Sequence, residues 1–156
     1  MYYSGLRISE ALSLTVDDVD AERMTLRVIG KGNKERLAPL PEALLDDLRE
    51  TWRMHRTRPW LFPNRQRTAA VSAATIRQAL KSACKEAGLD SAMITPHTLR
   101  HSFTTRLHEA DIPSETVRIL LGHSSVETTK RYLHLLEASR AKVAEALNTF
   151  CVRLLK

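Results

Sequence analysis

Two arginines, two histidines and one tyrosine stand out in this sequence because of the strings in which they occur. Arg7 lies in SGLRISEALSL, Arg100 in TPHTLRHSF, and Tyr132 near the end of LLGHSSVETTKRYLH. A guanidinium fork matches the non-bridging oxygens of a phosphodiester, so a pair of arginines can hold that group and neutralise charge in its transition state. A tyrosine hydroxyl can then be the nucleophile. The set indicates phosphoryl transfer that needs no metal ion.

The histidines extend this pattern and also allow a rival interpretation. His97 precedes Arg100 by three residues, so on one helix the two side chains share a side. His123 follows a glycine that is expected to end a helix. The rival takes His97 and His101, four residues apart, as metal ligands on a helix. That interpretation is weak, because Thr98 follows the first histidine where a zinc motif has its glutamate base.

Taken singly, each candidate has an ordinary structural explanation. Arg7 can pair with Glu10 one helical turn away. Lys31 falls in a turn, where a lysine is usually just solvated. A lone tyrosine in a helix, such as Tyr132, is more often a core residue with a satisfied hydroxyl. Only the combination of these residues favours chemistry.

Composition agrees with one domain that binds a polyanion, but does not require it. The 156 residues are 43% hydrophobic, enough for one core, and contain no apolar run long enough for a membrane span or a secretory signal. Lys and Arg number 24 against 18 Asp and Glu, a net charge of +6, which favours a nucleic acid partner or simply solubility, about equally. Cys84 and Cys151 are too few and too far apart for a disulfide framework or a zinc site.

Helix signals dominate the sequence, so we expect a mainly helical α+β fold. Apolar periods, caps and terminating glycines predict helices over 5–14 with Ser4 as cap, after Pro41, between Ser72 and Gly88, after Thr95, from Pro113 to Gly122, and through 143–154.

A β-hairpin and a long loop interrupt the helices. The strings MTLRVIG and KERLAPL alternate around residues 30–33, which is typical of a hairpin, here with lysines at its tip. A short strand over 16–19 is expected to pair alongside, giving a small three-stranded antiparallel sheet. Residues 55–71 hold two prolines and several arginines with no sustained period, which predicts a surface loop able to contact phosphate.

Several strings together resemble the tyrosine recombinase (phage integrase) family, and within it the Xer-type bacterial recombinases. They are GLRISE, VIGKGNKER, TPHTLRHSF, LLGHSS and TTKRYLH. They keep the family's order from Ser4 to about Leu136, which makes the resemblance highly specific although no single string decides it. The resemblance implies that residues 1–156 form the family's catalytic domain, a mainly helical α+β fold with a small three-stranded antiparallel sheet.

The resemblance also implies roles for the first half of the site. Arg7 and Arg100 are the paired phosphate clamp, and Glu10 is a supporting acid that orients Arg7. Lys31 at the hairpin tip is the general acid that protonates the departing 5′ hydroxyl of the DNA.

The second half of the site follows in the same way. His97 handles the proton of the tyrosine hydroxyl or bonds the phosphate, and His123 donates to a non-bridging oxygen. Tyr132 is the nucleophile, whose attack gives a 3′-phosphotyrosyl link and a free 5′ hydroxyl. The family reaction needs no metal and no cofactor, so we expect neither here. Four further basic residues are expected to contact DNA: Lys34, Arg36, Arg65 and Arg67.

The implied partners are double-stranded DNA and further copies of the chain. Family members form oligomers on DNA, usually by passing a C-terminal segment to a neighbour. The apolar face of Val143, Leu147 and Phe150 is suited to that exchange, or equally to folding back onto its own core. We expect a cytoplasmic protein without a membrane partner.

The chain departs from the family at its start. Family members normally place a core-binding domain and further catalytic-domain helices ahead of the first arginine, whereas only six residues precede Arg7 here. We therefore expect the chain to lack both, and an idle DNA-binding remnant stays open beside the recombinase, with a histidine-dependent metallohydrolase as a third possibility. The sequence does not separate integration, excision, transposition and dimer resolution.

Overall fold

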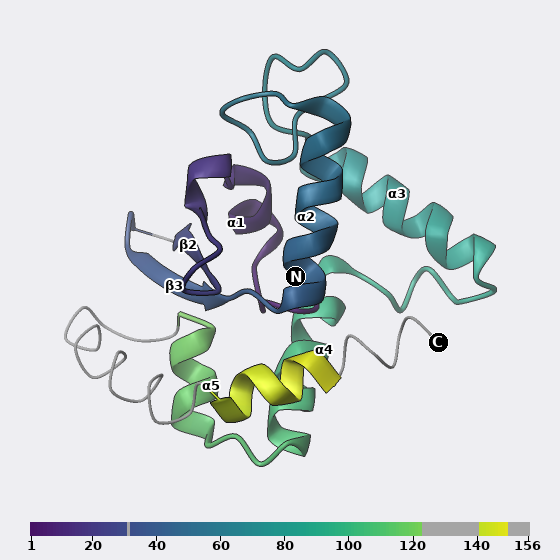
Figure 1. Cartoon of the computed structure of the whole chain (residues 1–156). Helices are drawn as coiled ribbons and strands as arrows, with labels where there is room; N and C mark the ends of the chain where they lie inside the picture. The colour runs from purple at the N-terminus through teal and green to yellow at the C-terminus, as the bar shows by residue number, and fades with distance from the viewer. Residues whose placement is uncertain (31, 123–140, 150–156) are drawn as a thin grey trace.

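The computed structural model describes residues 1–30, 32–122 and 141–149. In Figure 1 the sheet, α1 and α2 occupy the upper part of the molecule, and α4, α5 and a helix over 141–149 lie below them. Lys31, His123, Tyr132 and Phe150 lie outside the described residues. The mainly helical α+β fold expected from the sequence is confirmed.

The sheet is antiparallel, with its three strands in chain order: β1 (Val19–Asp20), β2 (Thr25–Ile29) and β3 (Glu35–Pro39). Strands β2 and β3 form the predicted hairpin, in which Val28 pairs with Arg36 and Leu26 with Ala38. Cross-strand partners share a face of the sheet, and Leu26, Val28 and Ala38 are each 1% exposed. Arg36, the second residue of β3, therefore lies on the face turned toward the core.

The strand expected over 16–19 is mostly a 3-10 helix, η1 (Val16–Asp18), and β1 begins only at Val19. The Asp18 carboxylate explains this, since it accepts hydrogen bonds from the backbone N–H and the hydroxyl of Thr15, at 2.8 and 2.7 Å. That local bonding turns the chain tightly before it can extend.

Helix α1 (Ile8–Ser13) starts later than the sequence predicted, and Ser4 is not its cap. Gly5 has a φ of +60°, which breaks the helix geometry ahead of Arg7. The hydroxyl of the fully buried Ser4 donates instead to the carbonyl of Pro39, at 2.6 Å, and so fastens the N-terminal segment to β3.

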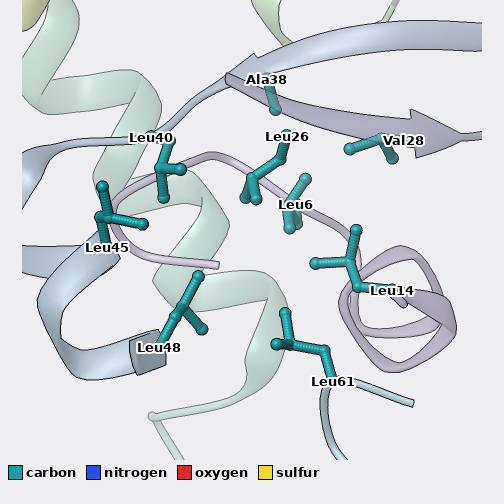
Figure 2. Close-up of a cluster of buried hydrophobic side chains, with 9 residues drawn as sticks. All are labelled: Leu6, Leu14, Leu26, Val28, Ala38, Leu40, Leu45, Leu48 and Leu61. Atoms are coloured by element: carbon teal, nitrogen blue, oxygen red, sulfur yellow. The ribbon is translucent and has the colours of Figure 1, made fainter. Parts of the chain in front are cut away.

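Leucines on either side of α1, from the hairpin and from α2 (Glu42–His55) make the first core, shown in Figure 2. Leu45 and Leu48 point from α2 toward the sheet, and Leu61 closes the cluster from the loop after α2. Each fully buried leucine contributes about 1.5–3 kcal/mol to the free energy of folding. The cluster comprises Leu6, Leu14, Leu26, Val28, Ala38, Leu40, Leu45, Leu48 and Leu61.

Three further helices follow the loop: α3 (Ala73–Glu86), α4 (Pro96–Glu109) and α5 (Ser114–Leu120). Two predicted caps are confirmed, because Ser72 accepts from the N–H of Thr75 at 3.1 Å and Thr95 from that of Thr98 at 3.2 Å. No helix in the described ranges is long and apolar enough to cross a membrane.

A second core joins α4, α5 and the helix over 141–149. Phe103 and Leu107 of α4 are buried there with Leu120 of α5. Val143 and Leu147 belong to the same cluster and are 3% and 1% exposed. In this structure the apolar face of the C-terminal helix therefore covers the core of its own chain.

Candidate active site

Arg7 and Glu10 form the first part of the site at the start of α1. The backbone N–H of Arg7 donates to one carboxylate oxygen of Glu10 at 2.7 Å, and its guanidinium donates to the other at 2.8 Å. The Glu10 side chain is 4% exposed, whereas that of Arg7 is 38% exposed. Glu10 thus orients Arg7, while part of the Arg7 side chain stays accessible to solvent.

Arg100 extends from the second turn of α4 and contacts Gly5, Glu10 and Leu121. Its guanidinium donates to the Gly5 carbonyl at 2.5 Å and to the Leu121 carbonyl at 2.8 Å. It also lies 3.5 Å from a carboxylate oxygen of Glu10, with its side chain 11% exposed. Arg7 and Arg100, which are 93 positions apart in the sequence, therefore meet at one carboxylate.

Gly5 allows this arrangement for a steric reason that the sequence did not reveal. A Cβ at this position would lie 2.6 Å from two ring carbons of Phe103, and its φ of +60° already disfavours any other residue. The close approach of the backbone to Phe103 places the Gly5 carbonyl against Arg100. The glycine in GLRISE is thus required by packing against α4.

Arg36 is the third guanidinium at the same carboxylate. It lies 2.7 Å from Glu10 and donates to the Leu120 carbonyl at 3.1 Å, and its side chain is 9% exposed. The sequence predicted a DNA contact for Arg36, but the structure places it inside the fold and not on the exposed hairpin surface. The signal was available, because Arg36 lies two residues before the buried Ala38 on β3, and residues two apart on a strand share a face.

The charges of this cluster determine the state of Glu10. Burial by itself would raise the pKa of Glu10, but the backbone N–H of Arg7, the charge of Arg36 and the side chain of Arg7 together lower it below its ordinary value of 4.5. Burial, assisted by the neighbouring Arg7, lowers the pKa of Arg100 to about 10. At neutral pH the cluster holds one carboxylate among three cations, so it is a net positive site.

We expect the lowered pKa of Glu10 to appear as a pH dependence of stability. Below about pH 4.5 the unfolded chain binds the proton more readily than the folded chain, so the contribution of Glu10 is complete above that pH and is lost as the pH falls through the folded pKa. The free energy of unfolding, measured with denaturant from pH 7 to pH 3, should therefore fall less in Glu10→Gln than in the wild type. The exposed Glu22→Gln is the control. Equal slopes for Glu10→Gln and the wild type would contradict this role for the carboxylate.

His97 lies in the first turn of α4 and is exposed, one helical turn before the buried Arg100. The structure thus keeps the predicted spacing and leaves the imidazole open to solvent. His101 is also exposed. Within the described ranges, no three metal-ligating side chains of His, Cys, Asp or Glu come together.

The remaining predicted DNA contacts lie on the surface. Lys34 is exposed beside the hairpin tip, and Arg65 and Arg67 are exposed in the loop after α2. That loop is ordered by Asn64, which accepts from the N–H of Thr68 at 3.0 Å. The backbone of Arg67 is left-handed there, with a φ of +61°.

Three of the six predicted catalytic residues, Arg7, His97 and Arg100, lie within the described part, and Arg7 and Arg100 meet at Glu10. Lys31, His123 and Tyr132 lie outside the described residues. A sequence model described as the phage integrase family matches residues 1–139.

The chain belongs to the phage integrase family.

Two relatives show how far this membership extends. A putative integrase/recombinase, y4qK of Sinorhizobium fredii, is 43% identical over 135 residues, which cover 86% of this chain and 44% of that protein. The tyrosine recombinase XerD of Yersinia pestis is 40% identical over 146 residues, which cover 86% of this chain and 47% of that protein. The chain thus spans about half the length of the curated relatives it matches.

Solved structures agree with the fold of a tyrosine recombinase catalytic domain. The crystal structure of XerA recombinase superposes with a TM-score of 0.72 at 29% identity, covering 90% of this chain and 53% of that one. XerH recombinase, in a pre-cleavage complex with its difH substrate, superposes with a TM-score of 0.70 at 30% identity, covering 88% of this chain and 43% of that one. The resemblance stated from the sequence motifs is confirmed.

Proposed function

We propose that this chain carries the catalytic site of a DNA breaking-and-joining enzyme for site-specific recombination. The observation that carries the proposal is the convergence of Arg7 and Arg100 on the buried Glu10, which holds two guanidiniums from opposite parts of the chain in one net positive site. Such a site suits the non-bridging oxygens of a phosphodiester. The family membership supports the same reaction.

In this mechanism the arginines hold the scissile phosphate and the tyrosine attacks it. The Tyr132 oxygen forms a bond to phosphorus while the bond to the 5′ oxygen breaks, which leaves a 3′-phosphotyrosyl link and a free 5′ hydroxyl. A free tyrosine has a pKa near 10, so nearby cations and a base must favour its phenolate. A second DNA end reverses the step, because the phosphodiester energy is kept in the covalent link.

The proton transfers are assigned to the remaining residues. His97 takes the tyrosine proton or bonds the phosphate, and His123 donates to a non-bridging oxygen. Lys31 donates a proton to the departing 5′ oxygen. The exposed position of His97 supports its part, since the imidazole is accessible to a bound DNA strand.

The function is tested by covalent capture. The chain is incubated with a pool of nicked suicide duplexes that have a randomised central sequence, and protein-linked strands are isolated under denaturing conditions and sequenced. We expect a linked strand attached through its 3′ end and a departing strand with a 5′ hydroxyl that polynucleotide kinase can label. Binding of the pool without any capture would contradict the enzyme and leave the idle DNA-binding remnant.

The proposed DNA surface comprises Lys34, Arg65 and Arg67. Each phosphate contact that is removed should lower the slope of log affinity against log salt by about 0.9 and weaken binding similarly for all sequences. We therefore expect this loss in Lys34→Ala and Arg65→Ala, measured by fluorescence anisotropy over a salt series. Arg49→Ala, an exposed arginine of α2 paired with Asp46, is the control. Unchanged slopes in both test variants would remove these residues from the interface.

We also propose that copies of the chain associate on DNA through the C-terminal helix. Val143 and Leu147 already pack in the core of their own chain. An exchange between copies would therefore replace these contacts by the same contacts in a neighbour, as in domain swapping.

A further inference from the structure

We infer that Arg36 is a positioning residue of the proposed cleavage site: it fixes the end of α5 against Glu10, and so sets where the chain leaves α5 relative to Arg7. The inference rests on the proposed function. It concerns a residue that has no assigned part in the bond changes above, and that acts through Glu10 and the backbone of α5.

The contacts of Arg36 join parts of the chain that are distant in sequence. One terminal nitrogen lies 2.7 Å from a Glu10 oxygen, 26 positions away, and the other donates to the Leu120 carbonyl, 84 positions away, at 3.1 Å. The first contact is with the acid that orients Arg7. The second is with the last residue of α5. The planar guanidinium of Arg36 therefore fixes the distance between α1 and the end of α5.

The end of α5 is held by two arginines at successive carbonyls. Arg36 binds that of Leu120, and Arg100 binds that of Leu121 at 2.8 Å. The last carbonyls of a helix have no partner within the helix and carry partial negative charge, so cations stabilise them. Both guanidiniums also lie near Glu10, at 2.7 and 3.5 Å. The end of α5 and Glu10, which orients Arg7, are thus joined through the same two guanidiniums.

Gly122 shows how closely Arg36 fits this position. It has a φ of +72°, and a Cβ there would lie 2.6 Å from Cδ and 2.7 Å from Nε of Arg36. The stem of Arg36 therefore packs directly on the backbone of Gly122. The next residue along the chain is His123, which begins the segment that also carries Tyr132. Arg36 thus sets the point from which that segment departs.

Burial separates the role of Arg36 from that of Arg7. The Arg7 side chain is 38% exposed and that of Arg36 is 9% exposed, although both bind Glu10. Both terminal nitrogens of Arg36 already bind protein partners, the Glu10 carboxylate and the Leu120 carbonyl. A lysine at position 36 would keep the charge but could not bind both partners in a fixed plane. The geometry, and not the charge alone, is what we expect the site to need.

The test compares Arg36→Lys with a matched control on the same sheet. Arg27 lies on β2, is 45% exposed and pairs with Asp18 and Glu35, so Arg27→Lys makes the same chemical change away from Glu10. The readouts are the melting temperature, the DNA affinity and the single-turnover rate of adduct formation at saturating DNA. We expect Arg36→Lys to lose roughly 10- to 100-fold in rate, as for a residue that orients a reacting group, with affinity and melting temperature close to wild type. Arg27→Lys should keep all three.

A double-mutant cycle checks that Arg36 acts through Glu10. Because the two side chains are in contact, the rate loss of Glu10→Gln with Arg36→Lys should be clearly smaller than the product of the single losses. A rate loss in the double variant equal to the product of the two single losses would overturn the inference. The test uses Arg36→Lys, so it still decides the inference if the larger change Arg36→Ala prevents folding.

The remaining outcomes are distinguishable from failure of the proposed function. A wild-type chain that forms no adduct contradicts that function, whatever Arg36 does. Adduct formation by the wild type with an unchanged rate in Arg36→Lys overturns this inference alone. A rate loss that follows a lower melting temperature shows a merely structural role, and one that follows a lower affinity with a reduced salt slope shows a DNA contact. Either result also overturns it.

Discussion

Replacing Tyr132 by phenylalanine should abolish covalent capture of DNA while leaving DNA binding intact. The proposed bond forms between the phenolic oxygen and phosphorus, so removing that one oxygen removes the nucleophile and little else. Neither the arginine cluster around Glu10 nor the exposed basic residues change in this variant. The measurement is a denaturing gel of protein with the captured suicide duplex, beside a binding titration of the same samples.

Tyr2 and Tyr3 are the matched controls, since the chain has three tyrosines. Their rings contact each other edge to face with centroids 5.2 Å apart, and the guanidinium of Arg106 lies 5.6 Å from the Tyr2 ring. Phenylalanine keeps the ring at either position, so both variants should still form the adduct. EDTA should not change the wild-type result, because all electrophilic assistance in the proposed mechanism comes from side chains. An adduct that survives in Tyr132→Phe, or that EDTA abolishes in the wild type, would contradict the mechanism.

Features that depend on local rules were predictable from the sequence. The hairpin follows from period-two alternation around a glycine-rich turn, and the caps at Ser72 and Thr95 follow from a side chain that reaches the next turn. The pairing of Arg7 with Glu10 follows from helical spacing, although the backbone N–H of Arg7 also takes part. In each case a short stretch of chain contains all the partners.

Features that depend on distant partners were not predictable in the same way. Ser4 resembles a helix cap, but its hydroxyl bonds the carbonyl of Pro39, and Gly5 bends the chain because the Phe103 ring lies against it. Arg36 resembles a surface residue of a basic hairpin, yet its partners are 26 and 84 positions away. A residue type restricts which partners are possible, and only the fold selects among them.

The site itself combines both kinds of information. The family motifs indicate which residues are catalytic, and the structure adds that Arg7 and Arg100 share one buried carboxylate with Arg36. No motif states that sharing, because it arises from packing α1, β3, α4 and α5 together. It has a chemical consequence: three cations compete for Glu10, so one carboxylate orders the cluster without neutralising it.

The second large effect concerns Lys31, which is proposed to donate a proton to the departing 5′ oxygen. Lys31→Ala should cleave ordinary DNA more slowly by roughly 10²–10⁴, the cost of losing a general acid. A substrate with sulfur at the bridging 5′ position changes the demand, because a thiolate leaves readily without a proton. The same variant should therefore recover most of its rate on the sulfur substrate, measured as single-turnover adduct formation.

Arg100→Ala is the comparison that separates proton donation from phosphate binding. Its guanidinium holds the phosphate in the proposed mechanism, so its loss should cost on the order of 10²–10³ on either substrate, with no rescue by sulfur. Equal rescue of both variants, or rescue of neither, would remove Lys31 from the role of acid. The exposed Lys34 lies three residues further along the same hairpin. Rescue of Lys34→Ala in place of Lys31→Ala would assign the proton to Lys34.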